Sequence, residues 1–326
     1  MSVATAIRTT SEPRPSRGRA LLVGSIVTFV AGLPTFFNRT DLPALENWGT
    51  IHLALVLQAL PFLVLGVVVS AVLSTFVAPG AMARVVPRTT IVAVPVAALA
   101  AAALPGCECS SVPVAGRLVS RGVPPAAALT FLLAAPAINP IVLIATSVAF
   151  PGRPEMVAAR FVASFLAATV VGLLWSRRRD ASTLRFRGHE HTGTPAERFT
   201  STVTHDFVQA GGFLVMGAAI VATIQTVVAP TTLQRLGGQG VVAVVLLSLA
   251  AFAMSLCSEA DAFVAAGMAQ FSPTARLAFL VVGPMVDVKL VLMQAGSFGR
   301  DFAVRFAPLT FVCAVASASL VGWVML

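Results

Sequence analysis

Two short stretches of this sequence carry thiol, hydroxyl and carboxyl groups close together in an otherwise apolar chain. They are PGCECSSVP, residues 105–113, and LCSEADAF, residues 256–263. Their candidate ligands are Cys107, Glu108, Cys109, Ser110, Cys257, Ser258, Glu259 and Asp261. Thiolates bind soft metalloids and soft or borderline metal ions, and added carboxylates suit zinc-like ions. Because ionisable groups are costly at membrane depth, we predict that the two stretches form two halves of one substrate site.

A second group of ionisable residues includes Asp287 and Lys289, which lie in an apolar segment; Lys289 is the only lysine of the chain. Lys289 could form an ion pair with Glu259 or Asp261 that only holds the two halves together. Alternatively one carboxylate, Glu108 included, takes and releases a proton to couple transport. Residues two apart on a helix point to opposite sides, so Asp287 and Lys289 should not pair with each other unless the helix is unwound.

The composition places these groups in a membrane protein. Of 326 residues 57% are hydrophobic and 11% are charged, which is far from the balance of a soluble domain. The net charge of +9 does not indicate nucleic-acid binding, because no basic stretch is interleaved with stacking aromatics and the chain has no Tyr. We predict an all-α polytopic membrane protein.

The lengths of the apolar runs indicate two hairpins that turn back inside the membrane. Ile91–Leu104 has 14 residues, which reach about 21 Å and cannot cross a hydrocarbon core of about 30 Å. After the first stretch, 112–119 returns towards the side from which the chain came. The span 126–150 is interrupted by Pro136, Asn139 and Pro140, and Asn139 and Pro140 are further candidates for substrate contact.

The second half of the chain repeats this order of segments. Shifted by 148 positions, Cys109, Ser110 and Pro136 fall on Cys257, Ser258 and Pro284, and a shift of 151 brings Gln58 and Gly66 onto Gln209 and Gly217. We predict a gene duplication. With three full crossings and one re-entrant hairpin in each half, the second half enters from the opposite face, which is an inverted-topology repeat. If each hairpin were two complete spans, the halves would still be inverted.

The basic residues set the expected orientation. With the N-terminus in the cytoplasm, Arg117 and Arg121 lie on the inner side and Arg160 starts a helix near the outer face, as the positive-inside rule requires. The expected divisions are a disordered tail (1–19), an N-terminal transmembrane helix (20–38), a first repeat (46–176), a basic cytoplasmic loop (177–203) and a second repeat (204–326). We therefore expect a multi-pass protein of the inner (plasma) membrane.

Helix starts next to the cysteines add to the chemistry of the two stretches. Ser110 or Ser111 could cap the returning helix of the first hairpin, and Ser258–Asp261 has the spacing of a capping box. A helix N-terminus favours the thiolate form of a nearby cysteine. Cys109 and Cys257 match under the repeat and are expected to act together, whereas Cys313, alone in the last span, is expected to be a small buried hydrophobe.

Extended to 105–142 and 256–290, the two stretches closely resemble the signature blocks of the predicted permease family that includes the ArsP organoarsenical efflux permeases. The resemblance runs from about Ile51 to the C-terminus. It implies export of trivalent organoarsenicals across the bacterial inner membrane, with Cys107, Cys109 and Cys257 binding arsenic as thiolates. The family's first block commonly reads Cys-Ser-Cys-Gly, whereas Glu108 and Ser110 take the second and fourth places here.

Two alternatives belong to other substrate or reaction classes. Glu108 beside the thiols suits a permease for a zinc-like metal ion. An intramembrane thiol redox enzyme would cycle Cys107 and Cys109 through a disulfide, but the sequence has no HExxH, no G-x-S-x-G and no GxxxxGK[ST] loop. We predict a transporter rather than an enzyme, with no cofactor, whose partners are membrane lipid and a small-molecule or metalloid substrate. A homo-oligomer is left open.

Overall fold

The computed structural model describes residues 42–77, 86–87, 89–102, 108–178, 194–227 and 240–326. The predicted tail at 1–19, the predicted helix at 20–38, Cys107 and residues 179–193 of the predicted loop lie outside these ranges. The chain divides into a unit of residues 1–46 and a unit of residues 47–326. Of the first unit only the start of one helix is described, and everything below concerns the second.

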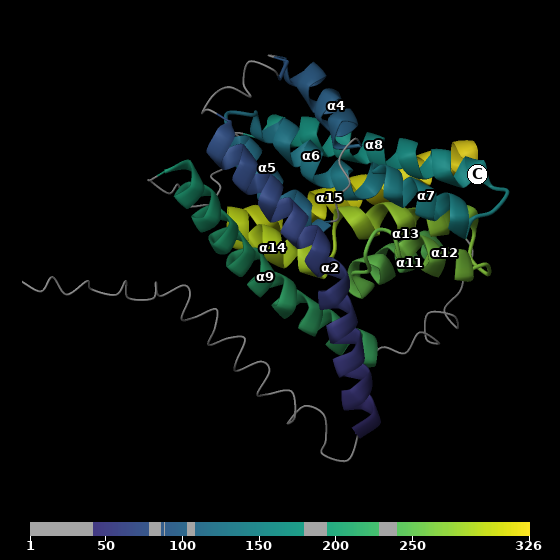
Figure 1. The fold of residues 1–326 in the computed structure, drawn as a ribbon. Coiled ribbons are helices and arrows are strands. Elements are labelled where there is room, and N and C mark those ends of the chain that lie inside the picture. The colour runs from purple at the N-terminus through teal and green to yellow at the C-terminus, as the bar shows by residue number, and fades with distance from the viewer. Residues whose placement is uncertain (1–41, 78–85, 88, 103–107, 179–193, 228–239) are drawn as a thin grey trace, which may run out of the picture. The chain divides into compact units, whose positions relative to one another are not determined.

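Every regular element in the described ranges is an α-helix (Figure 1). The helices are α2 (Leu42–Phe76), α4 (Thr90–Ala101), α5 (Glu108–Ser120), α6 (Pro125–Ile138), α7 (Pro140–Ala149), α8 (Pro154–Ser176), α9 (Pro195–Val227), α11 (Val241–Met254), α12 (Asp261–Gly267), α13 (Pro273–Met285), α14 (Val288–Phe298) and α15 (Arg300–Met325). Within these ranges six segments are long and apolar enough to cross a membrane: most of α2 and α9, the pairs α6–α7 and α13–α14, α8 and α15. The chain is an all-α polytopic membrane protein, as the sequence predicts.

Two apolar helices are too short to cross. The helix α4 has 12 residues and α11 has 14, so they reach about 18 Å and about 21 Å, against a hydrocarbon core of about 30 Å. Each is followed by one of the two thiol-bearing stretches and then by a second short helix, α5 or α12. That each pair is a re-entrant hairpin stays a prediction.

Both broken spans are interrupted at a polar residue that caps the next helix. Asn139 has extended backbone angles; its amide group donates to Ala135 O at 3.0 Å, and its Oδ1 accepts from Val142 N at 3.0 Å. In the second half Val286 and Asp287 are extended, and Asp287 Oδ1 accepts from Leu290 N at 2.5 Å. These bonds satisfy part of the backbone that each break frees. The breaks fall where the prolines predict them.

Helix contacts in one half have counterparts in the other. The helix α4 packs on α6 as α11 packs on α13, and α6 packs on α8 as α13 packs on α15. Each short helix contacts the other half: α5 lies against α14, and α12 lies against α7. In Figure 1, α5 and α14 lie on the left of the bundle and α7 and α12 on the right. This correspondence is what a duplicated chain should have, and the inversion of the halves stays a prediction.

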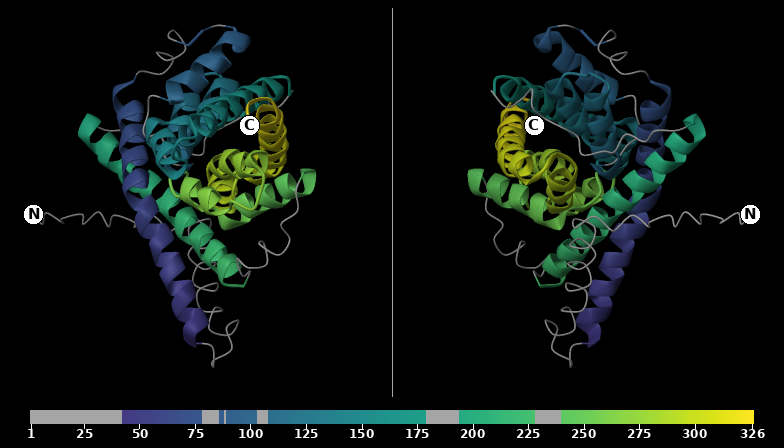
Figure 2. Two further views of the ribbon diagram at one scale, coloured as in Figure 1. Left: turned by 90° about the vertical axis from the view of Figure 1, so that its right-hand side faces the viewer. Right: turned by 90° about the vertical axis from the view of Figure 1, so that its left-hand side faces the viewer.

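The two long helices α2 and α9 cross each other along one flank of the bundle (Figure 2). A glycine in each helix allows close packing: Gly66 of α2 lies against α5, and Gly217 of α9 lies against α14. A Cβ atom at Gly66 of α2 would lie 2.5 Å from Ser110 Cα, and one at Gly217 of α9 would lie 3.1 Å from Lys289 Cα. Small residues of this kind let membrane helices approach closely. These are the two glycines that the predicted repeat matches.

Candidate functional site

The two matched cysteines lie in comparable places and are both buried. Cys109 is in the first turn of α5 and is 1% exposed, and Cys257 is in the segment between α11 and α12 and is 2% exposed. Neither forms a disulfide bond. Cys313 is a buried free thiol of α15, whereas Cys107 lies outside the described residues.

One ammonium group connects these cysteines. Lys289, in the first turn of α14, interacts electrostatically with Asp287 most strongly, and then with Glu108, Cys257 and Cys109. Its side chain is buried, and Gly217 of α9 allows the α14 backbone to approach α9 closely at this point. The structure therefore places charged or thiol groups of both stretches around Lys289. Whether one substrate contacts both thiols stays a prediction.

The partner of Lys289 differs from the one that the sequence analysis considered. Lys289 Nζ lies 3.7 Å from Asp287 Oδ2, and neither Glu259 nor Asp261 forms an ion pair with it. The pairing of residues two apart is feasible because Asp287 precedes the helix in an extended conformation, the exception stated for an unwound segment. Ser255 supports this turn, since its Oγ accepts a hydrogen bond from Val288 N at 3.1 Å.

Asp261 is bound by Arg160, a residue that the sequence analysis left out of the site. Arg160 of α8 is fully buried and donates to Asp261 Oδ2 at 2.9 Å, to Ser258 O at 3.1 Å and to Thr146 Oγ1 at 2.8 Å. We expected Arg160 near the outer face. The signal that could have identified it is a charge inside the apolar run 156–175, where such a charge needs a buried partner.

The predicted caps at the two stretches are wrong. The helix α5 begins at Glu108, so Ser110 and Ser111 lie inside it, and Ser111 Oγ donates to Glu108 O at 2.9 Å. At α12 no side chain caps the helix, and the backbone N–H groups of Ala260 and Asp261 both donate to Cys257 O. The capping-box spacing fails because α12 begins at Asp261 with Ala260 as its N-cap, so Ser258 lies before the cap position.

The remaining predicted residues are also placed by the structure. Ser110 and Ser258 are buried, and Glu259 is half-buried in the turn before α12. Asn139 is fully buried and uses both ends of its amide group at the α6–α7 break, and Pro140 takes the first position of α7. In the part of the chain that the structure describes, no three His, Cys, Asp or Glu side chains come together so as to hold a metal ion.

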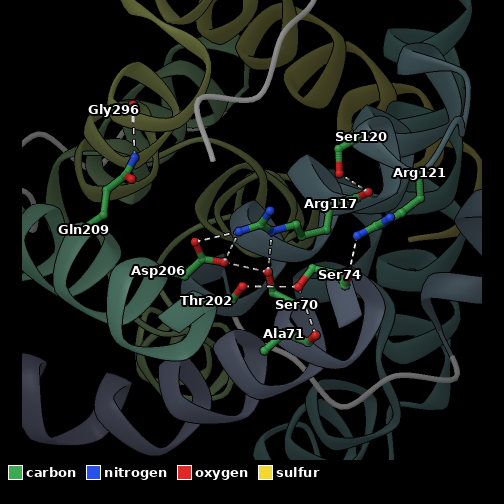
Figure 3. Close-up of polar contacts among 10 residues, drawn as sticks. All are labelled: Ser70, Ala71, Ser74, Arg117, Ser120, Arg121, Thr202, Asp206, Gln209 and Gly296. Atoms are coloured by element: carbon green, nitrogen blue, oxygen red, sulfur yellow. Dashed lines mark hydrogen bonds and ion pairs between the residues drawn. The ribbon is translucent and has the colours of Figure 1, made fainter. Parts of the chain in front are cut away.

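A second buried ion pair joins α5 to α9 (Figure 3). Arg117 donates to both carboxylate oxygens of Asp206, at 3.0 Å and 3.1 Å, and Ser70 Oγ of α2 donates to Asp206 Oδ2 at 2.8 Å. Arg121, just after α5, donates to Ser74 O. Both arginines are at most 3% exposed, so they are buried in the bundle, and their position towards the cytoplasmic side stays a prediction. Asp206 was missed because its partner lies 89 residues away.

Comparisons with known proteins agree on the class of this chain. A family model described as predicted permease matches residues 44–323. The chain is 35% identical over 278 residues to UPF0718 protein YcgR of Bacillus subtilis, covering 82% of this chain and 94% of that protein. It is 29% identical over 282 residues to a putative two-component membrane permease complex subunit of Streptococcus mutans, covering 83% of this chain and 94% of that protein. No solved structure matches the chain significantly.

Proposed function

We propose, from the premise that the chain belongs to the ArsP family of predicted permeases, that it exports a thiolate-binding solute across the plasma membrane. The chain is a multi-pass membrane permease. The solute we propose is a trivalent organoarsenical. The observation that carries this proposal is the burial of Cys109 in the first stretch and Cys257 in the second, two thiols that form no disulfide in a chain of a permease family.

The chemistry of such a site follows from the ammonium and the thiols. A neighbouring cation favours the thiolate form of cysteine, which is the form that binds soft metalloids. Two thiols replace two hydroxyl groups of a trivalent arsenical, forming two As–S bonds and releasing two water molecules. Arsenic keeps its oxidation state, so the exchange needs no oxidant or reductant. In this proposal Cys109 and Cys257 are the ligands, with Cys107, Ser110, Ser258, Asn139 and Pro140 as further contacts.

The charge at Lys289 also separates the two substrate classes. A divalent cation would be repelled by the buried ammonium, whereas a neutral arsenical would not. Glu108 supports the runner-up, a zinc-like ion, because it adds a carboxylate beside Cys109. A zinc-like ion at the thiols would therefore have to displace the Lys289 ammonium group, so we place the arsenical first.

Transport by alternating access requires a source of energy, and we propose a proton taken up by a carboxylate. Asp287 is the first candidate because its Oδ2 faces Lys289 at 3.7 Å, and Glu259 in the turn before α12 is the second. When Asp287 accepts a proton, the ion pair between Lys289 Nζ and Asp287 Oδ2 is lost, and the buried ammonium group must find other partners. Protonation is thereby linked to the state of the binding groups.

The setting of the protein completes the proposal. We propose that the N-terminus lies in the cytoplasm and that the two halves are inverted repeats with re-entrant hairpins. A thiol redox enzyme would need an obligatory disulfide between Cys107 and Cys109 during turnover, whereas the relatives' names describe permeases. Because the Streptococcus mutans relative is named as a complex subunit, we propose that the assay include the native host, where a partner chain would be present.

The test is growth and transport with cysteine variants. A null strain is grown on trivalent organoarsenicals, arsenite and zinc, and everted vesicles are assayed for uptake of whichever compound inhibits growth. The Cys109→Ser and Cys257→Ser variants should lose resistance to the arsenical while remaining in the membrane. Cys313→Ser is the matched control, since it removes a buried free thiol of α15 and should leave resistance unchanged.

A fully active double variant, with Cys109→Ser and Cys257→Ser together, would end the proposal that these thiols bind the substrate. Zinc sensitivity of the null strain without arsenical sensitivity would replace the proposed substrate by the runner-up. Transport that is unaffected by collapsing the proton gradient, and unaltered in both Asp287→Asn and Glu259→Gln, would exclude the proposed coupling.

A further inference from the structure

We infer that two of the three buried ion pairs among the described residues, Arg117–Asp206 and Arg160–Asp261, are the two gates of the proposed substrate site, one towards each face of the membrane. The inference rests on the proposed transport function, because gates are needed only by a site that opens alternately to the two sides. It concerns four side chains outside the group around Lys289.

The first pair fastens the short helix that carries Cys109. Arg117 lies in the last turn of α5, and its guanidinium group binds both oxygens of Asp206 on α9 at 3.0 Å and 3.1 Å. Ser70 of α2 completes the cluster, accepting from Arg117 Nε at 3.3 Å and donating to Asp206 (Figure 3). Three helices are thus held together by one buried bidentate pair.

The second pair fastens the segment that carries Cys257. Arg160 of α8 binds Asp261 at the start of α12, and it also binds the backbone carbonyl of Ser258, the residue after the cysteine. Thr146, near the end of α7, accepts from the same guanidinium group at 2.8 Å. The cysteine-bearing turn, α7 and α8 are therefore held by one arginine.

The two pairs lie towards opposite ends of one membrane span. The span α6–α7 runs from Pro125 to Ala149, about 37 Å of helix rise. Arg117 lies just before the turn at its start, and Arg160 lies in the second turn of α8, just after the turn at its end. Figure 1 agrees, with α5 on the left of the bundle and α7 and α12 on the right. We call these the α5 end and the α7 end.

Each pair also connects a short helix of one half to a long helix of the other half. Arg117 belongs to the first half and Asp206 to the second, and likewise Arg160 belongs to the first and Asp261 to the second. Opening a path to the Lys289 site at either end would separate such a pair. In the closed, water-free bundle the Coulomb attraction between the two charges is strong. Water that enters an open path hydrates the separated charges and thereby lowers the free-energy cost of separating them.

The experiment measures which face of the membrane can reach the site. Two parent proteins are made, each with a single cysteine: one keeps Cys109 and the other keeps Cys257, and the other three cysteines are replaced by serine. The remaining thiol is labelled with a membrane-impermeant maleimide in right-side-out and in inverted vesicles. Both thiols are at most 2% exposed, so baseline labelling is slow. Neither substrate nor transport is needed for this measurement.

Removing one gate should open one face. Asp206→Asn should raise the labelling rate from the α5 end about tenfold and lower it from the α7 end, and Asp261→Asn should do the reverse, within the roughly 5- to 150-fold range of typical conformational couplings. Exchanging the charges, with Arg117→Asp and Asp206→Arg together, should return the rates towards those of the parent. Glu197→Gln on α9 and Arg178→Gln after α8 are exposed controls and should change neither rate.

Labelling that rises from the same face in both variants, or that changes in neither, would overturn the inference. If the asparagine variants do not accumulate in the membrane, Arg117→Lys and Arg160→Lys are used instead. Lysine keeps the positive charge but lacks the planar guanidinium group, so these variants should give smaller changes in labelling rate with the same face specificity. If the labelling changes are face-specific but the protein transports no arsenical, the gate inference stands and the proposed substrate is rejected. If the protein transports the arsenical but the labelling changes are not face-specific, only the gate inference is rejected.

Discussion

The α6–α7 break and the α13–α14 break are built alike and charged differently. Both interrupt a membrane span after a proline-containing helix, and in both a side-chain oxygen at the break caps the following helix. The first break uses the neutral Asn139, whereas the second uses Asp287, whose other oxygen faces Lys289. A capped break is therefore common to both halves, and of the two capping residues only that of the second half is charged.

In the proposed mechanism, this difference assigns proton coupling to the break of the second half and leaves the break of the first half without a part in it. A neutral break can line a path, but it cannot change its charge when a proton or a solute arrives. A break with an ion pair can do both, because its electrostatics depend on the protonation of one carboxyl group. Changes that make the two breaks more alike, or that remove one cap, test this division.

The largest expected effect comes from Lys289→Met. This change leaves the fully buried Asp287 without its ion pair, and breaking a buried pair by removing one partner destabilises a protein by about 3–5 kcal/mol. We expect a clearly lower melting temperature of the purified protein and no transport. The double variant Lys289→Met with Asp287→Asn should regain most of the stability without regaining transport. A double variant that transports normally would show that the charged break is not needed.

A smaller effect is expected from Asp287→Asn, which gives the second break the residue of the first. Asparagine caps a helix as well as aspartate does, so the break should keep its shape. Lys289 retains its interactions with Glu108 and the thiols, and we expect a loss of about 2 kcal/mol, the scale of a hydrogen bond to a charged group. Transport should no longer respond to a proton gradient. An unaltered response in vesicles would assign the coupling to another carboxylate.

The smallest effect is expected from Asn139→Ala. The change removes the cap of α7, which is typically worth about 1 kcal/mol, and leaves the Val142 N–H without this acceptor. We expect a modest fall in melting temperature, with transport reduced but still dependent on the proton gradient. Loss of that dependence would contradict the division between the two breaks, because it would give the neutral break a part in coupling.

Local features of the sequence were enough to predict the helices that cross and the points at which they break. The length of an apolar run limits what can span a bilayer, and Pro136 and Pro140 limit where a helix can continue. These predictions depend only on neighbouring residues, and the structure bears them out at both breaks. The shift of 148 positions that matches the two halves also places Asn139 on Asp287.

Partners that are distant along the chain could not be predicted in this way. Arg117 binds a carboxylate 89 residues away and Arg160 binds one 101 residues away, and no periodicity connects such positions. The positive-inside rule concerns the side of the membrane on which an arginine lies, and it does not predict that Arg117 and Arg121 are buried. The caps at Ser110 and Ser258 failed for a related reason, because tertiary contacts decide where α5 and α12 begin.

The helix α9 links features that lie far apart in the bundle. Asp206 and Gly217 are eleven residues apart on this uninterrupted helix, about three turns and about 16 Å, so they project from nearly the same side. Asp206 forms the ion pair with Arg117 of α5, and Gly217 packs closely against the backbone of Lys289. A tilt of α9 that pulled the carboxylate away from Arg117 would therefore also shift the ammonium, and a larger side chain at position 217 would disturb this mechanical link.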